Sequence, residues 1–172
     1  VHTVAGTGEQ QFTAETGPAT ERALRHPTAI TFAPGGDLYI ADQVSIRKVD
    51  SHGVMHLVAG TGAAGYNGDG IPATSAQLDS PDGLVSRFGG KLFVSDSGNG
   101  RLRLIDEDGT INTLAEVSPS GLAVDMHGNL YYHRAGTARI ERYLPHLDVV
   151  EPVAGTGSPG FSGDGGPALD AQ

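Results

Sequence analysis

The stretch Val58–Asp106 reads VAGTGAAGYNGDGIPATSAQLDSPDGLVSRFGGKLFVSDSGNGRLRLID. Its first five residues, VAGTG, occur three times in the chain, at Val4–Gly8, Val58–Gly62 and Val153–Gly157. Each copy is followed at fixed distances by an aromatic residue, an acidic residue and a proline, namely Phe12, Glu15 and Pro18; Tyr66, Asp69 and Pro72; and Phe161, Asp164 and Pro167. Repetition at fixed offsets predicts a fold that is built from repeated structural units.

A second repeated block has the pattern of short β-strands. Branched and aromatic residues in short runs, separated by glycine turns, indicate strands and hairpins. The aligned runs are Leu38–Asp42, Leu92–Asp96 and Leu130–Arg134, each after a glycine turn at Pro34–Gly36, Phe88–Gly90 or Met126–Gly128. Each run should be preceded by one strand, at Ala29–Phe32, Gly83–Ser86 or Gly121–Val124. Two strands should follow each run. In the first unit they are Ile46–Val49 and Met55–Ala59, in the second Arg101–Ile105 and Ile111–Ala115, and in the third Arg139–Tyr143 and Val150–Ala154. Four antiparallel strands in about 40–54 residues are typical of a β-propeller blade.

The residues from Asp79 to Asp106 resemble the NHL repeat, with its P-x-G-[LIV] strand, its L-Y-[VI]-[AS]-D strand and its R-[IL]-R strand. The resemblance extends more weakly over the rest of the chain and is closest to bacterial and extracellular NHL-repeat proteins. It implies an all-β fold, with blades that belong to a six-bladed NHL β-propeller. We divide the chain into an outer strand and loop (1–27), a blade (28–60), a loop (61–80), blades at 81–115 and 119–154, and a final loop (155–172). Arg134 and His133 depart from the pattern, because they replace an aspartate and a small residue.

Three blades do not close a ring, since propellers have about 4–8 blades. The chain has an outer strand (His2–Ala5) with its loop before the first blade, and another such strand and loop after the last. Two copies arranged head to tail would compete for one position. We therefore expect the remaining blades of a longer protein to complete the ring, with a second copy of the chain as the alternative and a swapped or irregular assembly as the third.

The composition excludes several classes of function. The 172 residues include no cysteine, which rules out disulfides and thiol chemistry. The net charge of −9 argues against nucleic acid as a partner, because a negative surface repels phosphates. No apolar run reaches the roughly 20 residues of a membrane-spanning helix. The compartment is not encoded in the composition, and only the resemblance favours an extracytoplasmic or secreted location.

The candidate binding residues lie on the face that should carry the long loops, where binding sites usually occur on a rigid scaffold. The aromatic residues of the three loops form either a stacking platform or anchors that hold each loop, and repetition at one offset favours anchors. Charge contacts around the third strand should be structural, exposed pairs that join Asp42 and Asp96 to Arg47, Arg101 and Arg139. The full candidate set is Phe12, Tyr66, Phe161, Asp96, Asn99, Arg101, His133 and Arg134.

We expect no resident cofactor. Calcium is the alternative at Asp69 and Asp164, but one carboxylate per loop is far fewer ligands than Ca²⁺ takes. No histidine recurs at an axial position, and no nucleophile or phosphate-binding motif is present. The sequence therefore favours a non-enzymatic scaffold or binding module for a protein or glycan. The alternatives are part of a propeller lyase or hydrolase with an axial metal, and a self-assembling propeller without a ligand.

Overall fold

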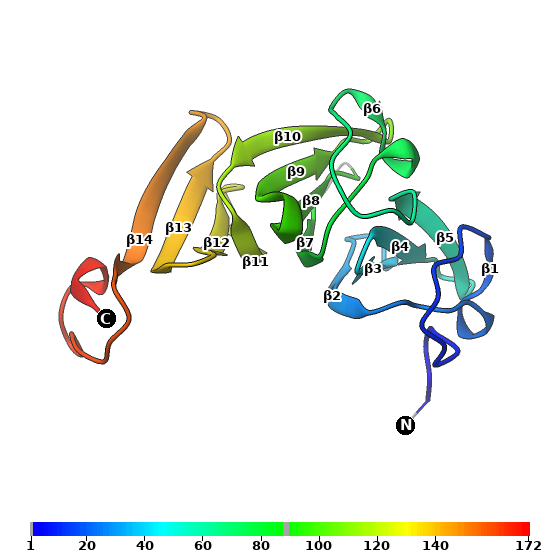
Figure 1. Ribbon diagram of the computed structural model, residues 1–172, viewed down its shortest axis with the longest axis horizontal. Coiled ribbons are helices and arrows are strands. Elements are labelled where there is room, and N and C mark those ends of the chain that lie inside the picture. Colours follow the sequence, from blue (N-terminus) through cyan, green and yellow to red (C-terminus); the bar gives the residue numbers. More distant parts are fainter. Residues whose placement is uncertain (1, 88–89) are drawn as a thin grey trace.

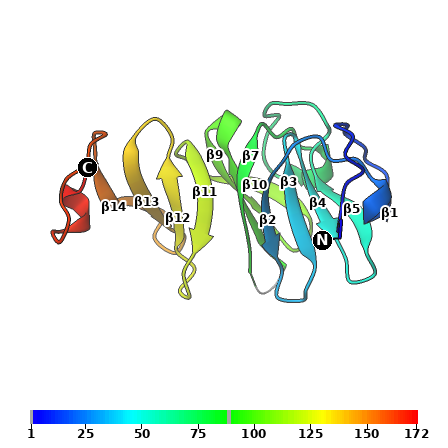
Figure 2. The same cartoon turned by 90° about the horizontal axis from the view of Figure 1, so that it is seen from below.

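Three antiparallel β-sheets lie side by side in an open arc (Figure 1). The computed structural model describes residues 2–87 and 90–172. Seen from the perpendicular direction, the sheets follow one another like the blades of a fan (Figure 2). This arrangement confirms the prediction of an all-β fold made of propeller blades, and we call the three sheets blades A, B and C in chain order.

Each blade has four strands that are joined by short turns. Blade A comprises β2 (Pro27–Phe32), β3 (Leu38–Asp42), β4 (Ser45–Val49) and β5 (Val54–Ala59). Blade B comprises β7 (Pro81–Ser86), β8 (Leu92–Asp96), β9 (Arg101–Ile105) and β10 (Thr110–Glu116). Blade C comprises β11 (Pro119–Val124), β12 (Leu130–Arg134), β13 (Ala138–Leu144) and β14 (Val149–Gly157). The first strands meet on the inside of the arc, where β7 packs between β2 and β11.

The long loops add a fifth strand to the blade that follows them. The short strand β6 (Ile71–Pro72) pairs with β10, and β1 (Gly17–Pro18) pairs with β5 in the same way. Each loop thus covers the outer edge of the next blade and satisfies backbone groups that would otherwise be exposed. Single 3₁₀ turns follow at η1 (Ala19–Glu21), η2 (Ala73–Ser75) and η4 (Ala168–Asp170), and η3 (Ser97–Asn99) lies within blade B.

Side chains of the second strand alternate between the two neighbouring blades, as a period of two requires. In β8, Leu92 and Val94 are buried against blade A, whereas Phe93 is buried against blade C. In β12, Leu130 and Tyr132 face blade B. We call the side of a blade toward the N-terminal end of the arc its near face, and the opposite side its far face.

One detail of the expected secondary structure differs from the structure. His2–Ala5, expected as an outer strand, has no regular secondary structure. Two residues of the predicted turn Phe88–Gly90 lie outside the described part of the chain. Within that part, no helix has the length and hydrophobicity needed to cross a bilayer.

Candidate functional site

A buried arginine fixes the loop that covers blade B. Arg103 in β9 is fully buried, and its Nη2 donates to the carbonyl oxygen of Gly68 (3.1 Å) and to Asp69 (3.0 Å). Its Nη1 donates to Asp96 (3.3 Å), which is also fully buried. Burial raises the pKa of Asp96, although hydrogen bonds from Asn99, the backbone of Asp79 and Arg103 act in the opposite direction. Charge-assisted hydrogen bonds of this kind fix geometry tightly.

The aromatic residue of the same loop packs on two arginines. The guanidinium carbon of Arg101 lies 4.0 Å from the ring centroid of Tyr66, and that of Arg103 lies 5.0 Å away. The Tyr66 hydroxyl donates to Asp69 (2.9 Å), and Thr113 donates to the same carboxylate (3.0 Å). The geometry favours the interpretation of Tyr66 as a loop anchor, with cation–π contacts as its source of stability.

Blade A repeats this arrangement in a weaker form. Arg47 in β4 is fully buried and lies 5.6 Å from the ring of Phe12, but within the described residues its only side-chain hydrogen bond goes from Nη2 to Thr13 (3.0 Å). Its Nε and Nη1 find no hydrogen-bond partner among the described residues. Burial lowers the pKa of Arg47, and the nearby Asp42 opposes that shift. Glu15, which aligns with Asp69, instead pairs with Arg22 (3.1 Å) at the surface.

Blade C reverses the charges of the buried pair that Asp96 and Arg103 form in blade B. Arg134 takes the position of Asp96, and Glu141 takes that of Arg103, since Tyr132 pairs with Glu141 as Val94 pairs with Arg103. Arg134 Nη1 donates to Glu141 Oε1 (3.0 Å), and the hydroxyl of Tyr132 donates to Oε2 (3.1 Å). The reversal is therefore compensated within the blade.

The reversal coincides with the absence of a covering loop. Residues 117 and 118 join β10 to β11 directly, so no GDG loop lies over blade C. A cleft of about 420 Å³ opens where the loop lies in blade B. Its lining residues are Arg134, Thr137, Arg139, Glu141, Thr156, Gly157 and Ser158. Glu141 forms the buried floor, whereas the Arg134 side chain is 46 % exposed at the rim. We call this feature the blade C cleft.

The structure divides the candidate residues into two groups. Asp96, Asn99 and Arg101 belong to the internal network of blade B: Asn99 Nδ2 donates to Gly65 O (2.7 Å) and Asp96 (2.9 Å), and Arg101 pairs with Glu116 (2.7 Å). The expectation that the charge contacts around the third strand are exposed is wrong for Asp42, Asp96 and Arg47, which are fully buried.

The second group is accessible. Arg134 lines the blade C cleft, and His133 is exposed beside it, with Nε2 2.7 Å from the carbonyl oxygen of Thr137. Phe161 lies on the C-terminal loop and is 92 % exposed. Sequence reasoning missed Arg103 and Glu141; an alignment of the third strands would have shown Arg47, Arg103 and Glu141 at one position.

The acids proposed for calcium are in different surroundings. Asp69 is occupied by Arg103 and Thr113, whereas Asp164 is exposed. Among the described residues, no group of three or more potential metal-ligating side chains is found. The expectation of no cofactor stays a prediction.

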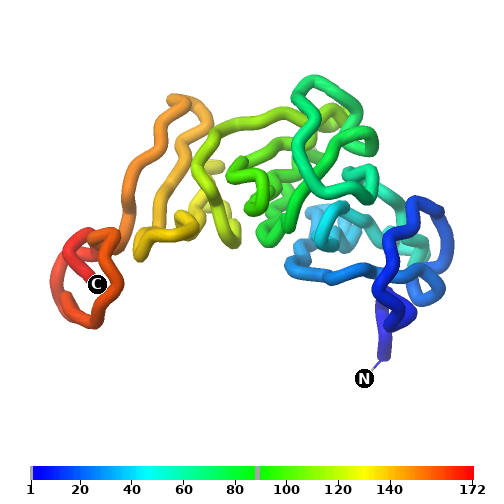
Figure 3. The backbone as a smooth tube through the Cα atoms, in the orientation of Figure 1, coloured from blue at the N-terminus to red at the C-terminus, as the bar shows by residue number. Residues whose placement is uncertain are grey.

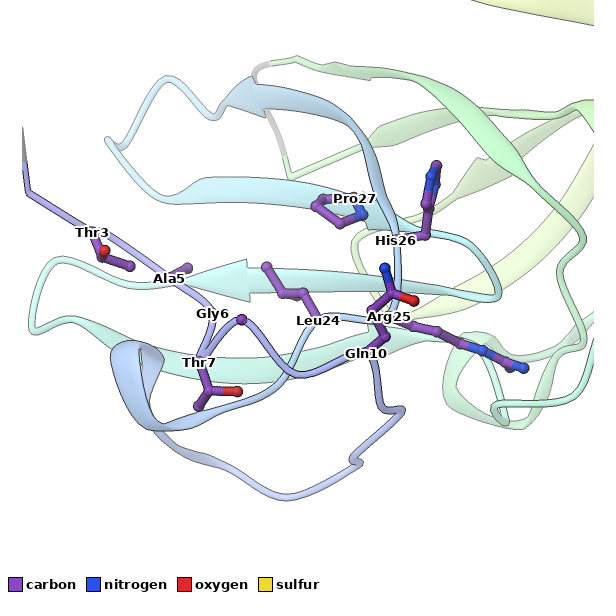
Figure 4. A pocket seen from close by; sticks show the side chains of 10 residues that line it. Thr3, Ala5, Gly6, Thr7, Gln10, Leu24, Arg25, His26 and Pro27 are labelled. Carbon is purple, nitrogen blue, oxygen red and sulfur yellow. The ribbon is translucent and has the colours of Figure 1, made fainter.

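Another cavity lies at the opposite end of the arc. It has a volume of about 480 Å³ and separates the N-terminal segment from the entry to blade A (Figure 4). Figure 4 shows Leu24 pointing toward the segment at Ala5 and Gly6, with His26 and Arg25 directed to other sides. Half of its ten lining residues are small, namely Thr3, Ala5, Gly6, Thr7 and Gly8. We interpret this cavity as loose packing of the N-terminal segment.

Blades in an arc with loops on one face define the chain as part of a β-propeller. A scan against protein-family profiles finds no match. The chain is 40 % identical over 106 residues to the protein SUPPRESSOR OF QUENCHING 1, chloroplastic, of Arabidopsis thaliana, which covers 57 % of this chain and 10 % of that protein. It is 29 % identical over 109 residues to teneurin-1 of Gallus gallus, which covers 56 % of this chain and 4 % of the relative. The chain thus spans a tenth or less of these relatives.

Solved structures show the same fold. Virginiamycin B lyase from Staphylococcus aureus superimposes with a TM-score of 0.56 at 15 % identity, over 80 % of this chain and 44 % of the lyase. An auxiliary nutrient binding protein from Bacteroides ovatus superimposes with a TM-score of 0.61 at 19 % identity, over 81 % of this chain and 33 % of that protein. At these identities the likeness shows the propeller fold alone. Assignment to NHL repeats stays a prediction.

Proposed function

We propose that the chain is a non-enzymatic binding module that holds a protein ligand in the blade C cleft. The observation that carries this proposal is that the cleft is open where blade B is filled by its own loop. In blade B the occupant is a protein segment with an aromatic ring and a carboxylate, bound through two arginines. In blade C, Arg134 and Arg139 line the cleft, and no other part of the described residues fills it.

The chemistry of the cleft specifies the kind of ligand. The Arg139 Nη2 donates to Thr156 O (2.8 Å), which holds the guanidinium plane at the rim as a stacking surface. Arg134 is bound through Nη1 to Glu141, so its charge is partly neutralised while its exposed side still faces solvent. A loop that stacks an aromatic ring on Arg139 and directs a carboxylate to Arg134 fits both groups.

The similarity to teneurin-1, and the nutrient-binding protein among the fold neighbours, support a binding role. The lyase among the fold neighbours keeps an enzymatic role as an alternative. An extracytoplasmic location is part of the proposal and rests on the resemblance to extracellular NHL-repeat proteins. Retention of zinc or calcium after mild dialysis, measured by elemental analysis, would favour the enzyme instead.

A peptide that reproduces residues 62–77 of the chain tests the proposal, because it carries Tyr66 and Asp69 in their natural spacing. We expect NMR shifts at Arg139 and Thr156 on titration, and their loss with Arg139→Ala or with a peptide in which alanine replaces Tyr66. A glycan array run with the parent chain and Arg139→Ala covers the other ligand class. Glycan binding that depends on Arg139 would support the cleft as the binding site and overturn the proposal of a protein ligand. Unchanged peptide binding by Arg139→Ala would overturn the proposal that the cleft is the binding site.

A further inference from the structure

The outer edge of blade C lacks the covering strand that the other two blades have. Blades A and B each contain five strands, because the loop before the blade adds β1 or β6 to the outer edge. Blade C contains four, and among the described residues β14 pairs with β13 alone. The cause is internal to the chain, since residues 117 and 118 join β10 directly to β11 and supply no covering strand. Figure 3 shows no segment beside the beginning of β14 (orange), whereas residues 60–80 cross the outer part of blade B.

The strand register identifies the position that is left uncovered. In blade B, Ile111 pairs with Ile71 of β6 on one side and with Ile105 of β9 on the other. In blade C, Val150 pairs with Tyr143, which occupies the position of Ile105 in its own blade. Val150 therefore corresponds to Ile111, at the point where a covering strand would pair.

An apolar contact is absent at this position of blade C. Ile111 in blade B and Met55 in blade A are fully buried, and the covering segments contribute Ala73 and Ala19 to the same apolar clusters. Val150 is 37 % exposed. Its cross-strand partner is buried against blade B, so Val150 faces a neighbouring blade of this chain and not the far face of blade C.

A backbone acceptor is also free at the same edge. In blade B the Ala73 N–H donates to Gly109 O (2.8 Å), and blade A has the equivalent bond (2.8 Å). The corresponding residue of blade C is Asp148, directly before β14, whose φ of +56° is in the left-handed region that Gly109 also occupies. The Tyr143 hydroxyl donates to the Asp148 carboxylate (3.0 Å) and so holds this residue in place. The Asp148 carbonyl oxygen accepts no backbone hydrogen bond in the described part of the chain.

We propose that the protein ligand of blade C adds a short β-strand to the outer edge of β14 through an extended segment that contains Pro-Ala. Strand addition to an open sheet edge is a recurring mode of peptide recognition. Both covering segments of this chain have this sequence, since residues 17–19 read GPA and residues 71–73 read IPA. The alanine packs on Val150 and donates its N–H to Asp148 O, as in the other two blades. The proline has no N–H that would need an acceptor.

The edge itself limits the length of the added strand. Pro152 lies two residues after Val150 and has no N–H to offer, which is typical of a strand at the edge of a sheet. The added strand is therefore as short as β1 and β6, which have two residues each. The inference takes the protein ligand from the proposed function, but it rests on backbone contacts and not on the arginines of the blade C cleft.

Backbone methylation of the peptide of residues 62–77 tests the proposal. In blade B the amides of Gly70 and Ala73 donate to Ile111 O (3.0 Å) and Gly109 O (2.8 Å). N-methyl groups on these two amides remove the donors and leave every side chain of the peptide unchanged. A peptide methylated at Ala64 is the matched control, because the Ala64 amide donates no backbone hydrogen bond within the described residues.

We expect the unmodified peptide to shift the NMR signals of Asp148 and Val150 in the full chain. Methylation at Gly70 and Ala73 should abolish these shifts and weaken binding about tenfold, which is the effect of losing two hydrogen bonds. The control peptide should bind as the unmodified one does. Val150→Glu should also weaken binding, whereas Leu147→Glu should not, since Leu147 lies in the adjacent turn and is 60 % exposed.

Equal binding of the methylated and unmodified peptides would overturn strand addition and leave the cleft as the binding site. Shifts at Val150 that depend on the two amides but persist in Arg139→Ala would support strand addition and overturn the cleft. Light scattering of the chain alone tests a second copy as the occupant. Self-association that Val150→Glu abolishes would overturn the proposal of a different protein as the ligand.

Discussion

Replacing Arg103 with methionine should destabilise the fold severely and release one loop in particular. The substitution removes the hydrogen bonds to Gly68 and Asp69 and leaves Asp96 buried without its cation. Breaking a buried pair by removing one partner costs about 3–5 kcal/mol. For a chain of this size, that loss lowers the melting temperature by about 6–20 °C. Urea unfolding followed by circular dichroism measures the free energy of unfolding directly.

The cost of Arg103→Met should increase with pH. Burial already raises the pKa of Asp96 above its value in the unfolded chain. An acid of this kind costs no stability while it is protonated, below the unfolded pKa of about 3.9; the cost grows as the pH rises from there toward its folded pKa and is complete above it. We therefore expect a larger loss at about pH 8 than at about pH 4.5. Adding Asp96→Asn to Arg103→Met should restore part of the stability at the higher pH.

Hydrogen exchange separates loop release from general destabilisation. The amides of Gly70 and Ala73 donate to Ile111 O (3.0 Å) and Gly109 O (2.8 Å), which holds the loop on the outer edge of blade B. These amides should lose protection in Arg103→Met before the amides of the blade strands do. Lys91→Ala is the matched control, since its ion pair with Asp106 is largely exposed and contributes about 0–1 kcal/mol. A loss below about 1 kcal/mol in Arg103→Met, with the loop amides still protected, would refute the reasoning.

Two further predictions concern single residues. Hydrogen bonds from His56 and from backbone N–H groups lower the pKa of Asp50 to about 2. The contribution of Asp50 to stability is therefore present above about pH 3.9 and is lost as the pH falls toward 2. The difference in melting temperature between the parent and Asp50→Asn should shrink over that range. Gly60 has φ +101°, and a Cβ there would overlap the Val44 carbonyl oxygen, so Gly60→Ala should lose more than about 1 kcal/mol in urea unfolding, whereas Gly35→Ala, in open space with ordinary φ, should not.

The strand pattern could be read from the sequence because it depends on local rules. Runs such as Leu92–Asp96 contain branched and aromatic residues between glycine turns, and the structure forms strands at the same residues. The first strands begin two residues earlier than expected, at Pro27, Pro81 and Pro119. Proline is accepted at the start of a strand, which explains why these prolines belong to it.

The buried arginines could not be read in the same way. Arginine is almost never fully buried unless it is paired, so a residue-by-residue analysis places Arg47 and Arg103 at the surface. Their partners, Gly68 and Asp69 for Arg103, are more than thirty positions away in the sequence. Only the fold brings the loop over the blade. The blade C cleft was not predicted either: the repeat pattern shows that no GDG loop precedes this blade, but only the fold shows that a cleft lies in its place.

The charge on the third strand of a blade depends on the loop that covers that blade. This relation gives the deviation at Arg134 a physical reason. An arginine on the third strand is useful where a GDG loop lies above it, because the loop supplies the carbonyl and carboxylate that offset its burial. Without the loop, an arginine at position 141 would be buried with fewer partners, as Arg47 is in blade A. Glutamate there, with Arg134 opposite, keeps a neutral pair and leaves the position open. The reversed charge pair thus allows blade C to be stable without a loop that covers the cleft.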